Sequence, residues 1–204
     1  MIRGILCTAR AAVFIAAVGT LLAGCGFLDS SSMVAPTQMT INSQAFSQNI
    51  LPSDFTCHTG DPASPPLAWF GGPPGTKSYA LVVDDSSAPI TPYIYWIVFD
   101  ISPTTTDIQQ GHLPPGARQA LNSAGQASYD PPCPQANPHS YRFTIYALNQ
   151  VLQLPAGTST QSAWMAIAAA TIGRGRTCAT ASSDPSRLIG LTTSGCGSTG
   201  SGNP

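Results

Sequence analysis

The strongest structural signal in the chain is the run from Tyr141 to Leu148, with the sequence YRFTIYAL. Its side chains alternate between two faces, as they do along a β-strand. One face carries Tyr141, Phe143 and Ile145, and the other carries Arg142, Thr144 and Tyr146. Two further runs, KSYALVVD at 77–84 and IYWIVFDI at 94–101, have the length and the β-branched and aromatic content of buried strands. The sequence therefore predicts a β-rich domain built around these three runs.

One segment predicts a helix. Residues 161–172 are rich in alanine, follow Ser159 and Thr160 as candidate N-caps, and precede Gly173 as a candidate C-cap. We expect Trp164 and Met165 to lie in the core, and Arg174 and Arg176 to follow the helix, where cations favour its C-terminal dipole. Weaker strand signals occur at 41–46 and around Tyr129.

The composition excludes several classes of protein. Only 8% of the 204 residues are charged, all nine acids are Asp, and Lys77 is the single lysine. Long surface helices need more charged and amide side chains than this, which excludes a helical bundle or coiled coil. With a formal net charge of −1, the chain lacks the excess of positive charge that is typical of proteins that bind nucleic acid. Glycine and proline, at 19 each, supply the turns of a β-domain, and the 43% hydrophobic content excludes a disordered chain.

The first 25 residues have the pattern of an export signal. Arg3 and Arg10 precede an apolar stretch, 11–22, that is too short to span a bilayer. The ending Leu22-Ala23-Gly24-Cys25 resembles the lipobox of bacterial lipoproteins, in which the leader is cut before the Cys and the Cys is acylated. The alternative is an ordinary secretory leader in which Cys25 has no role. The resemblance implies a lipid anchor, palmitate included, on Cys25 at the extracytoplasmic face of the cell membrane.

These features divide the chain into four parts. We expect a removed signal peptide at 1–24, the lipidated Cys25 with a flexible tether to residue 38, a folded domain at 39–191, and a Gly/Ser-rich tail at 192–204.

Four cysteines remain once Cys7 leaves with the leader and Cys25 is acylated: Cys57, Cys133, Cys178 and Cys196. An even number in an exported protein predicts two disulfides, with three connectivities open. A metal site built from Cys57, His58, Cys133 and His139 has the right ligand types, but the spacing fits no compact zinc pattern and export favours disulfides. We therefore expect no metal and no cofactor.

Several short motifs, read in order, carry a resemblance to one family. They are SPPLAW at 64–69, PGTKSYAL at 74–81, DDSSAP at 84–89, Asn122 with Gly125, YDPPCP at 129–134, HSY at 139–141 and YAL at 146–148. Together they resemble the phosphatidylethanolamine-binding protein family, also called Raf kinase inhibitor-like proteins. The resemblance covers about 39–172. It implies a mainly β fold, a two-sheet antiparallel β-sandwich with one or two peripheral helices.

The family also has a small anion pocket, and this chain matches it in part. The residues carried over to that pocket are Asp85, Ser87, Tyr95, Pro131 and His139. Asp85, Pro131 and His139 match the family pattern, as do Ala88, Pro89, Pro132 and Tyr141. Ser87 stands in place of a second Asp, Tyr95 in place of a His, and Ser140 in place of an Arg. The resemblance thus implies a pocket that has lost charged groups, which either takes a neutral or weakly anionic ligand or serves only packing.

The resemblance also favours one disulfide pairing. Cys57 and Cys133 flank loops that the family brings together around its pocket, so we expect these two to be bonded. Cys178 and Cys196 would then form the second pair and hold the tail to the domain.

No motif of a known enzyme class occurs in the chain. We therefore expect a non-enzymatic, membrane-anchored lipoprotein that binds a small ligand or a protein of the cell envelope, and no nucleic acid. The alternatives are an interaction or protease-inhibitor module without a working pocket, and an envelope enzyme, which would need a nucleophile beside an oriented base.

Overall fold

The computed structural model describes residues 35–85, 87 and 92–189, which form two β-sheets and one α-helix. The signal peptide, Cys25, the first part of the tether and the tail, all expected from the sequence, lie outside these residues. Thr37 and Gln38, which we placed at the end of the tether, form the first strand of the large sheet.

The large sheet has six strands in the order β1-β9-β8-β4-β5-β7. All neighbours are antiparallel except β1 and β9. The strands are β1 (Thr37–Gln38), β4 (Ser78–Asp85), β5 (Ile94–Ile101), β7 (Arg118–Gln119), β8 (His139–Leu148) and β9 (Thr171–Ala181). The three runs that the sequence analysis singled out are thus β4, β5 and β8, and β8 and β4 lie at the centre.

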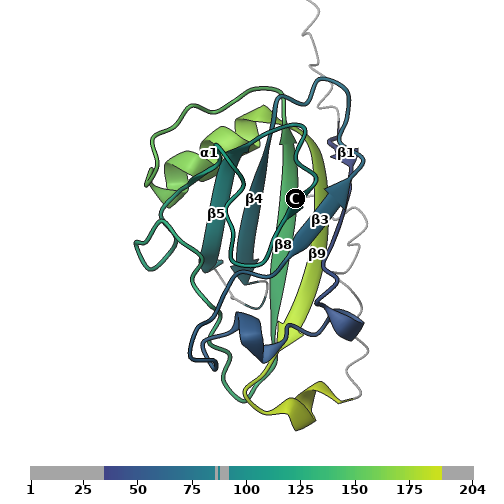
Figure 1. Cartoon of the computed structure of the whole chain (residues 1–204), viewed down its shortest axis with the longest axis vertical. Coiled ribbons are helices and arrows are strands. Elements are labelled where there is room, and N and C mark those ends of the chain that lie inside the picture. Colours follow the sequence, from purple (N-terminus) through teal and green to yellow (C-terminus); the bar gives the residue numbers. More distant parts are fainter. Residues whose placement is uncertain (1–34, 86, 88–91, 190–204) are drawn as a thin grey trace, which may run out of the picture. The chain divides into compact units, whose positions relative to one another are not determined.

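The small sheet has three antiparallel strands in the order β2-β3-β6. They are β2 (Thr40–Asn42), β3 (Leu67–Phe70) and β6 (Asp107–Ile108). Three single-turn 3-10 helices, η1 (Ser47–Asn49), η2 (Ser53–Phe55) and η3 (Pro185–Leu188), complete the described elements. Figure 1 shows β3 lying across β8 and β9. The region of Tyr129, for which a weak strand was expected, is a loop.

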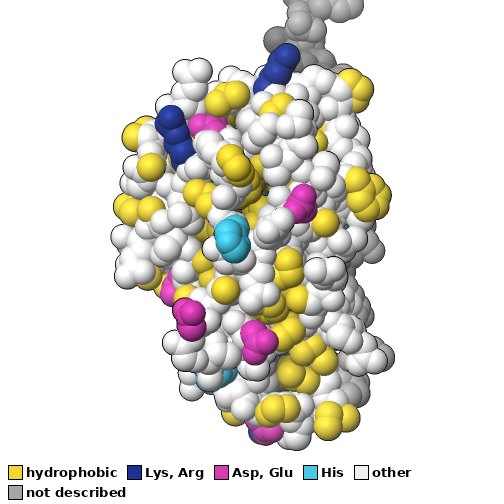
Figure 2. All heavy atoms as spheres, in the orientation of Figure 1, with side chains coloured by type: hydrophobic (Ala, Val, Ile, Leu, Met, Phe, Trp, Pro, Cys, Tyr) yellow, Lys and Arg dark blue, Asp and Glu magenta, His cyan; other side chains and the backbone are white. Residues whose placement is uncertain are grey.

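The large sheet buries both of its faces. One face packs against the small sheet through a cluster that includes Leu81, Val83, Phe143, Ile145 and Trp69. The other face packs against α1 (Thr160–Ala170) through a second cluster with residues of β4, β5 and β8. Two covered faces explain why few polar side chains are needed along these strands. Charged side chains are accordingly few and scattered on the face in Figure 2.

The helix differs from its prediction at one end and on one face. Ser159 caps its N-terminus, with its Oγ accepting a hydrogen bond from the Ser162 N–H at 3.1 Å, as expected. The helix ends at Ala170, however, and Gly173 lies within β9 rather than at a C-cap. A Cβ at Gly173 would lie 2.8 Å from the ring of Pro73, so close packing between segments explains the glycine.

The expected core positions of α1 were also wrong in part. Ala163, Ile167 and Ala170 face the sheet, at the spacing of one helix face. Trp164 and Met165 lie off that face and are 42% and 63% exposed. Arg174 and Arg176 do come after the helix in the chain, but they lie within β9, which begins at Thr171, directly after the helix ends at Ala170. In the part of the chain that the structure describes, no helix is long and apolar enough to cross a membrane.

Gly175 gives a test of this packing. A Cβ at this position would lie 2.6 Å from the carbonyl oxygen of Met39, in the segment that joins β1 to β2. We expect Gly175→Ala to lower the free energy of unfolding by about 1–3 kcal/mol, because backbone atoms would have to move apart. Gly60→Ala is the control, since nothing lies within 4 Å of its Cβ and its change should stay within about 0.5 kcal/mol. The measurement is urea unfolding. If Gly175→Ala and Gly60→Ala changed the free energy of unfolding equally, the close contact between Gly175 and Met39 would be contradicted.

Candidate functional site

The candidate site lies where β4 ends and β8 begins. In the antiparallel register, Asp85 at the end of β4 lies opposite Tyr141 near the start of β8. On the other side of β4, Asp84 lies opposite Ile94, next to Tyr95 on β5. Three strands that are distant in sequence therefore place Asp85, Tyr95 and His139 at one end of the sheet.

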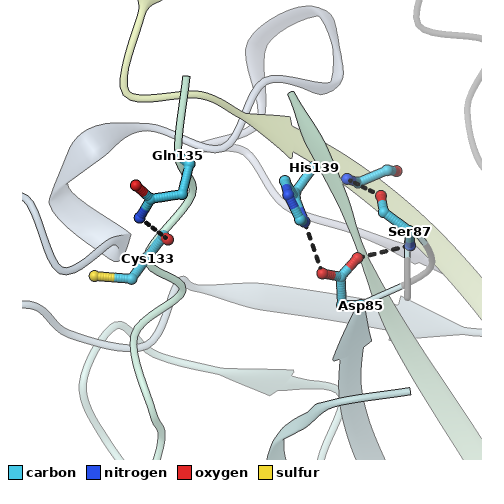
Figure 3. A network of polar contacts seen from close by, with 6 residues as sticks. Asp85, Ser87, Cys133, Gln135 and His139 are labelled. Carbon is cyan, nitrogen blue, oxygen red and sulfur yellow. Dashed lines mark hydrogen bonds and ion pairs between the residues drawn. The ribbon is translucent and has the colours of Figure 1, made fainter. Parts of the chain in front are cut away.

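Asp85 and His139 form the polar centre of this site. Nδ1 of His139 lies 2.9 Å from Oδ2 of Asp85, and the two face one another in Figure 3. The carboxylate is buried, with 8% of its side chain exposed, whereas the imidazole is 38% exposed. The carboxylate thus fixes the orientation of the ring through Nδ1 and leaves Nε2 for a ligand, as second-shell carboxylates do elsewhere.

Ser87 closes the network. Its backbone N–H donates to Oδ1 of Asp85 at 2.6 Å, and its Oγ accepts from the Ser140 N–H at 3.1 Å. Both oxygens of Asp85 are therefore bonded within the protein (Figure 3). Ser87 ties its loop to β8, a role in positioning that the sequence did not indicate. Ala88 and Pro89, which match the family pattern, lie outside the described residues.

An aromatic wall flanks the network. The Tyr95 ring packs between those of Tyr93 and Tyr141, with centroids 4.7 and 5.4 Å away. Burial, together with the nearby charge of Asp85, raises the pKa of Tyr95 well above its usual value. Burial and the hydrogen bond from its hydroxyl to Asp130 raise the pKa of Tyr93 to about 12. Tyr95 therefore remains a neutral hydrogen-bond donor at physiological pH.

Pro131 lies in a loop that is fastened on both sides. The N–H of Asp130 donates to the Tyr95 carbonyl at 3.0 Å, which joins the loop to β5. On the other side the loop meets residues 55–58. The contacts there are Tyr129 Oη to the Phe55 carbonyl at 2.8 Å, the Cys57 N–H to the Pro132 carbonyl at 3.0 Å, His58 Nε2 with the Pro134 carbonyl at 3.2 Å, and a disulfide between Cys57 and Cys133. Pro131 itself is half-buried.

The disulfide also bears on the metal alternative. With Cys57 and Cys133 bonded to each other, neither sulfur is a thiolate ligand. Across the described ranges, no three His, Cys or Asp side chains gather as a metal site. Cys178 is disulfide-bonded as well. Its expected partner Cys196 lies outside the described residues, so the second pairing stays a prediction.

Asp84 belongs to the opposite face of the sheet, as expected for a neighbour of Asp85 in a strand. It forms an ion pair with Arg142, its cross-strand partner on β8. The two carboxylates therefore serve separate groups and do not act as an acid pair.

Elsewhere, a hollow of about 470 Å³ brings Asp61, Ser64 and His112 to one surface. These are the residue types of a hydrolytic triad, but none of the hydrogen bonds between described residues joins them. Nδ1 of His112 instead lies 2.6 Å from the Gln110 carbonyl. The arrangement lacks the contact between nucleophile and base that such chemistry requires.

The family model for phosphatidylethanolamine-binding protein matches residues 42–182, which is more than half of the chain. This chain belongs to the phosphatidylethanolamine-binding protein family. The family and the β-sandwich expected from the sequence motifs are thereby confirmed.

Individual relatives agree with this family assignment. A UPF0098 protein of Methanothermobacter thermautotrophicus is 36% identical over 144 residues, which cover 68% of this chain and 95% of that protein. A Mycobacterium tuberculosis protein named "Putative lipoprotein LppC" is 40% identical over 145 residues, which cover 70% of this chain and 71% of that protein.

Two solved structures of family members have a fold similar to that of this chain. A phosphatidylethanolamine-binding protein homologue, CT736 of Chlamydia trachomatis, is similar with a TM-score of 0.66 and 32% identity, covering 72% of this chain and 99% of that one. YbcL of E. coli, described as a new member of the mammalian family, is similar with a TM-score of 0.65 and 27% identity. The match covers 71% of this chain and 98% of that one. Both matches thus cover nearly the whole of the solved chain and about seven-tenths of this one.

The sequence motifs did not identify every residue of the site. Tyr93 and Asp130 were not expected there, yet their hydrogen bond at 2.7 Å joins the residue that precedes β5 to the proline loop. The alternation of Tyr93 with Tyr95 was a usable signal, because residues two apart lie on one face of a strand.

The disulfide provides a prediction for this site. Cys57 and Cys133 are 76 residues apart, so their bond restricts the unfolded chain strongly. Removing it with Cys57→Ser and Cys133→Ser together should lower the free energy of unfolding by about 4 kcal/mol. Non-reducing peptide mapping should recover the two cysteines in one linked peptide. Recovery of both as free thiols, or of Cys57 linked to Cys178, would show the pairing to be wrong.

Proposed function

We propose that this protein is a non-enzymatic lipoprotein, anchored to the cell membrane through Cys25, whose domain binds a small polar ligand beside Asp85 and His139. The observation that carries the ligand site is the Asp85–His139 contact, because a buried carboxylate holds a partly exposed imidazole at the end of a rigid sheet. Tyr95 and Ser87 add neutral hydroxyl groups to it.

The donor set determines the class of ligand. An imidazole and two hydroxyls provide hydrogen bonds but at most one positive charge. A doubly charged phosphate is normally held by several cationic or backbone donors. We infer that a neutral or singly charged oxygen-bearing molecule suits this site better than a phosphomonoester.

One observation favours the alternative, an interaction or inhibitor module with no working pocket. Both oxygens of Asp85 are bonded within the protein, so this carboxylate has structural partners even without a ligand. A ligand titration distinguishes a ligand-binding domain from an interaction or inhibitor module.

That titration uses inorganic phosphate and phosphoethanolamine, followed by calorimetry or NMR. We expect binding by the unchanged protein to be millimolar or weaker, about −4 kcal/mol. Ser87→Asp with Tyr95→His restores the family's charged groups and should strengthen binding at least tenfold, since one charge-assisted hydrogen bond contributes about 1.5–3 kcal/mol. His139→Ala should abolish the gain, whereas His112→Ala should not.

Two outcomes would count against this assignment. Micromolar binding of phosphate by the unchanged protein would mean that the pocket has lost no affinity. No gain in the double variant would place the pocket elsewhere.

The anchor has its own test. The proposed anchor rests on the lipobox-like ending at Cys25, and the lipoprotein name of the mycobacterial relative supports it. Cys25→Ser should move the protein from the membrane fraction to the soluble or secreted fraction after a carbonate wash. Cys7→Ser removes a cysteine from the same leader and should leave the protein in the membrane. Retention of the Cys25→Ser protein would refute the anchor.

A further inference from the structure

A second polar surface lies on the face of the large sheet that α1 covers in part. Cross-strand partners share one face, and β9 pairs Arg174 with Tyr146 and Arg176 with Thr144. Tyr146 packs in the cluster with α1, whereas Phe143 and Ile145 pack toward the small sheet. Arg174 and Arg176 therefore lie beside the helix, on the face away from the small sheet.

These two arginines are not neutralised by described carboxylates. Of the six Lys and Arg residues after Arg10, three are on this face, and only Arg142 forms an ion pair there, with Asp84. Arg174 and Arg176 are exposed, and neither has a salt bridge to a carboxylate in the ranges that the structure describes. Nε of Arg176 donates to Thr144 Oγ1 at 3.0 Å, which holds this guanidinium close to the sheet.

Aromatic side chains continue the surface, and of these Trp164 is exposed. The Tyr146 ring, near Arg174 and Arg176, packs edge-on against Trp164 with centroids 6.4 Å apart. Trp164 and its neighbour Met165 are among the exposed large apolar side chains of the domain. We call the set of Arg174, Arg176, Tyr146 and Trp164 the Arg–Trp face.

The start of the domain lies at the same place. Gln38 on β1 pairs with Arg174 in the parallel register, and Thr37 pairs with Gly173. Nine residues, 26–34, lie between Cys25 and Ala35, the first described residue, so ten Cα–Cα steps join the two. Such a segment reaches at most about 35 Å and has a root-mean-square span of about 17 Å when flexible. An anchor on Cys25 would therefore keep the edge strand beside Arg174 close to the bilayer.

We propose that the Arg–Trp face docks on the anionic phospholipid surface to which the chain is anchored. Guanidinium groups bind lipid phosphates, and Trp favours the boundary between headgroups and acyl chains. The inference rests on the anchor of the proposed function. The register places His139 seven residues along β8 from Tyr146, about 23 Å at the rise of a strand. Because residues an odd number apart in a strand point to opposite faces, His139 lies on the face of the sheet opposite to Tyr146, and docking leaves the candidate pocket on the side away from the lipid.

The test makes use of Trp164. Trp69 and Trp96 are only 2% and 3% exposed, so quenching by lipids reports on Trp164. Chain 26–204 with an N-terminal histidine tag is held on vesicles that contain a nickel-chelating lipid and brominated phosphatidylcholine, with or without phosphatidylglycerol. The chelating lipid replaces the acyl chains on Cys25, so failure here and failure of the anchor are distinguishable.

We expect stronger quenching on the vesicles with phosphatidylglycerol, and its loss at high salt. Arg174→Gln with Arg176→Gln should lower the ratio of docked to undocked protein about fivefold for each arginine, about 25-fold together. Lys77→Gln with Arg187→Gln removes the same charge elsewhere and should retain the quenching. Three outcomes would overturn the proposal. They are no quenching of the unchanged protein on the anionic vesicles, the same quenching in the arginine variant as in the unchanged protein, and the same loss of quenching in the control variant as in the arginine variant.

Discussion

The register between β4 and β8 is the constraint on which the rest of this structure depends. It places Asp85 opposite Tyr141 and Asp84 opposite Arg142 along a ladder of eight pairs. A slip of one residue would turn every side chain to the other face, which would bury the wrong set of residues on both sides of the sheet. Because both faces are covered, the apolar contacts at the centre determine which carboxylate meets His139 and which meets Arg142.

Much of this fold was predictable because its central strands carry a local signal. Alternation along 141–148 and the apolar runs at 77–84 and 94–101 identified β8, β4 and β5. The end of α1 was not predictable from local sequence, because Gly173 has the composition of a helix stop but is a glycine for close contact with Pro73. Trp164 and Met165 were misplaced for a similar reason: small residues, Ala163 and Ala170, let the helix lie close to the sheet, and the large ones turn outward.

The candidate site was predictable only through ordered motifs, since its members are far apart in the chain. Asp85 and His139 were found in this way and do meet, 54 residues apart. The contacts of Ser87, Tyr93 and Asp130 depend on loop conformations, which residue identity alone does not determine. The Cys57–Cys133 bond follows the same logic, because its position reflects how the proline loop meets residues 55–58.

Ser87 and Tyr95 contribute neutral hydroxyl groups, so Asp85 and His139 determine the charge of the candidate site. Asp85 gives both oxygens to internal partners, so its charge serves to orient His139. A protonated His139 beside an ionised Asp85 sums to zero, and a neutral His139 leaves the pair at −1. Neither state attracts a dianion, and the neutral Tyr95 adds a donor without adding charge. An oxygen-bearing ligand with little or no charge therefore meets the fewest unfavourable charges here.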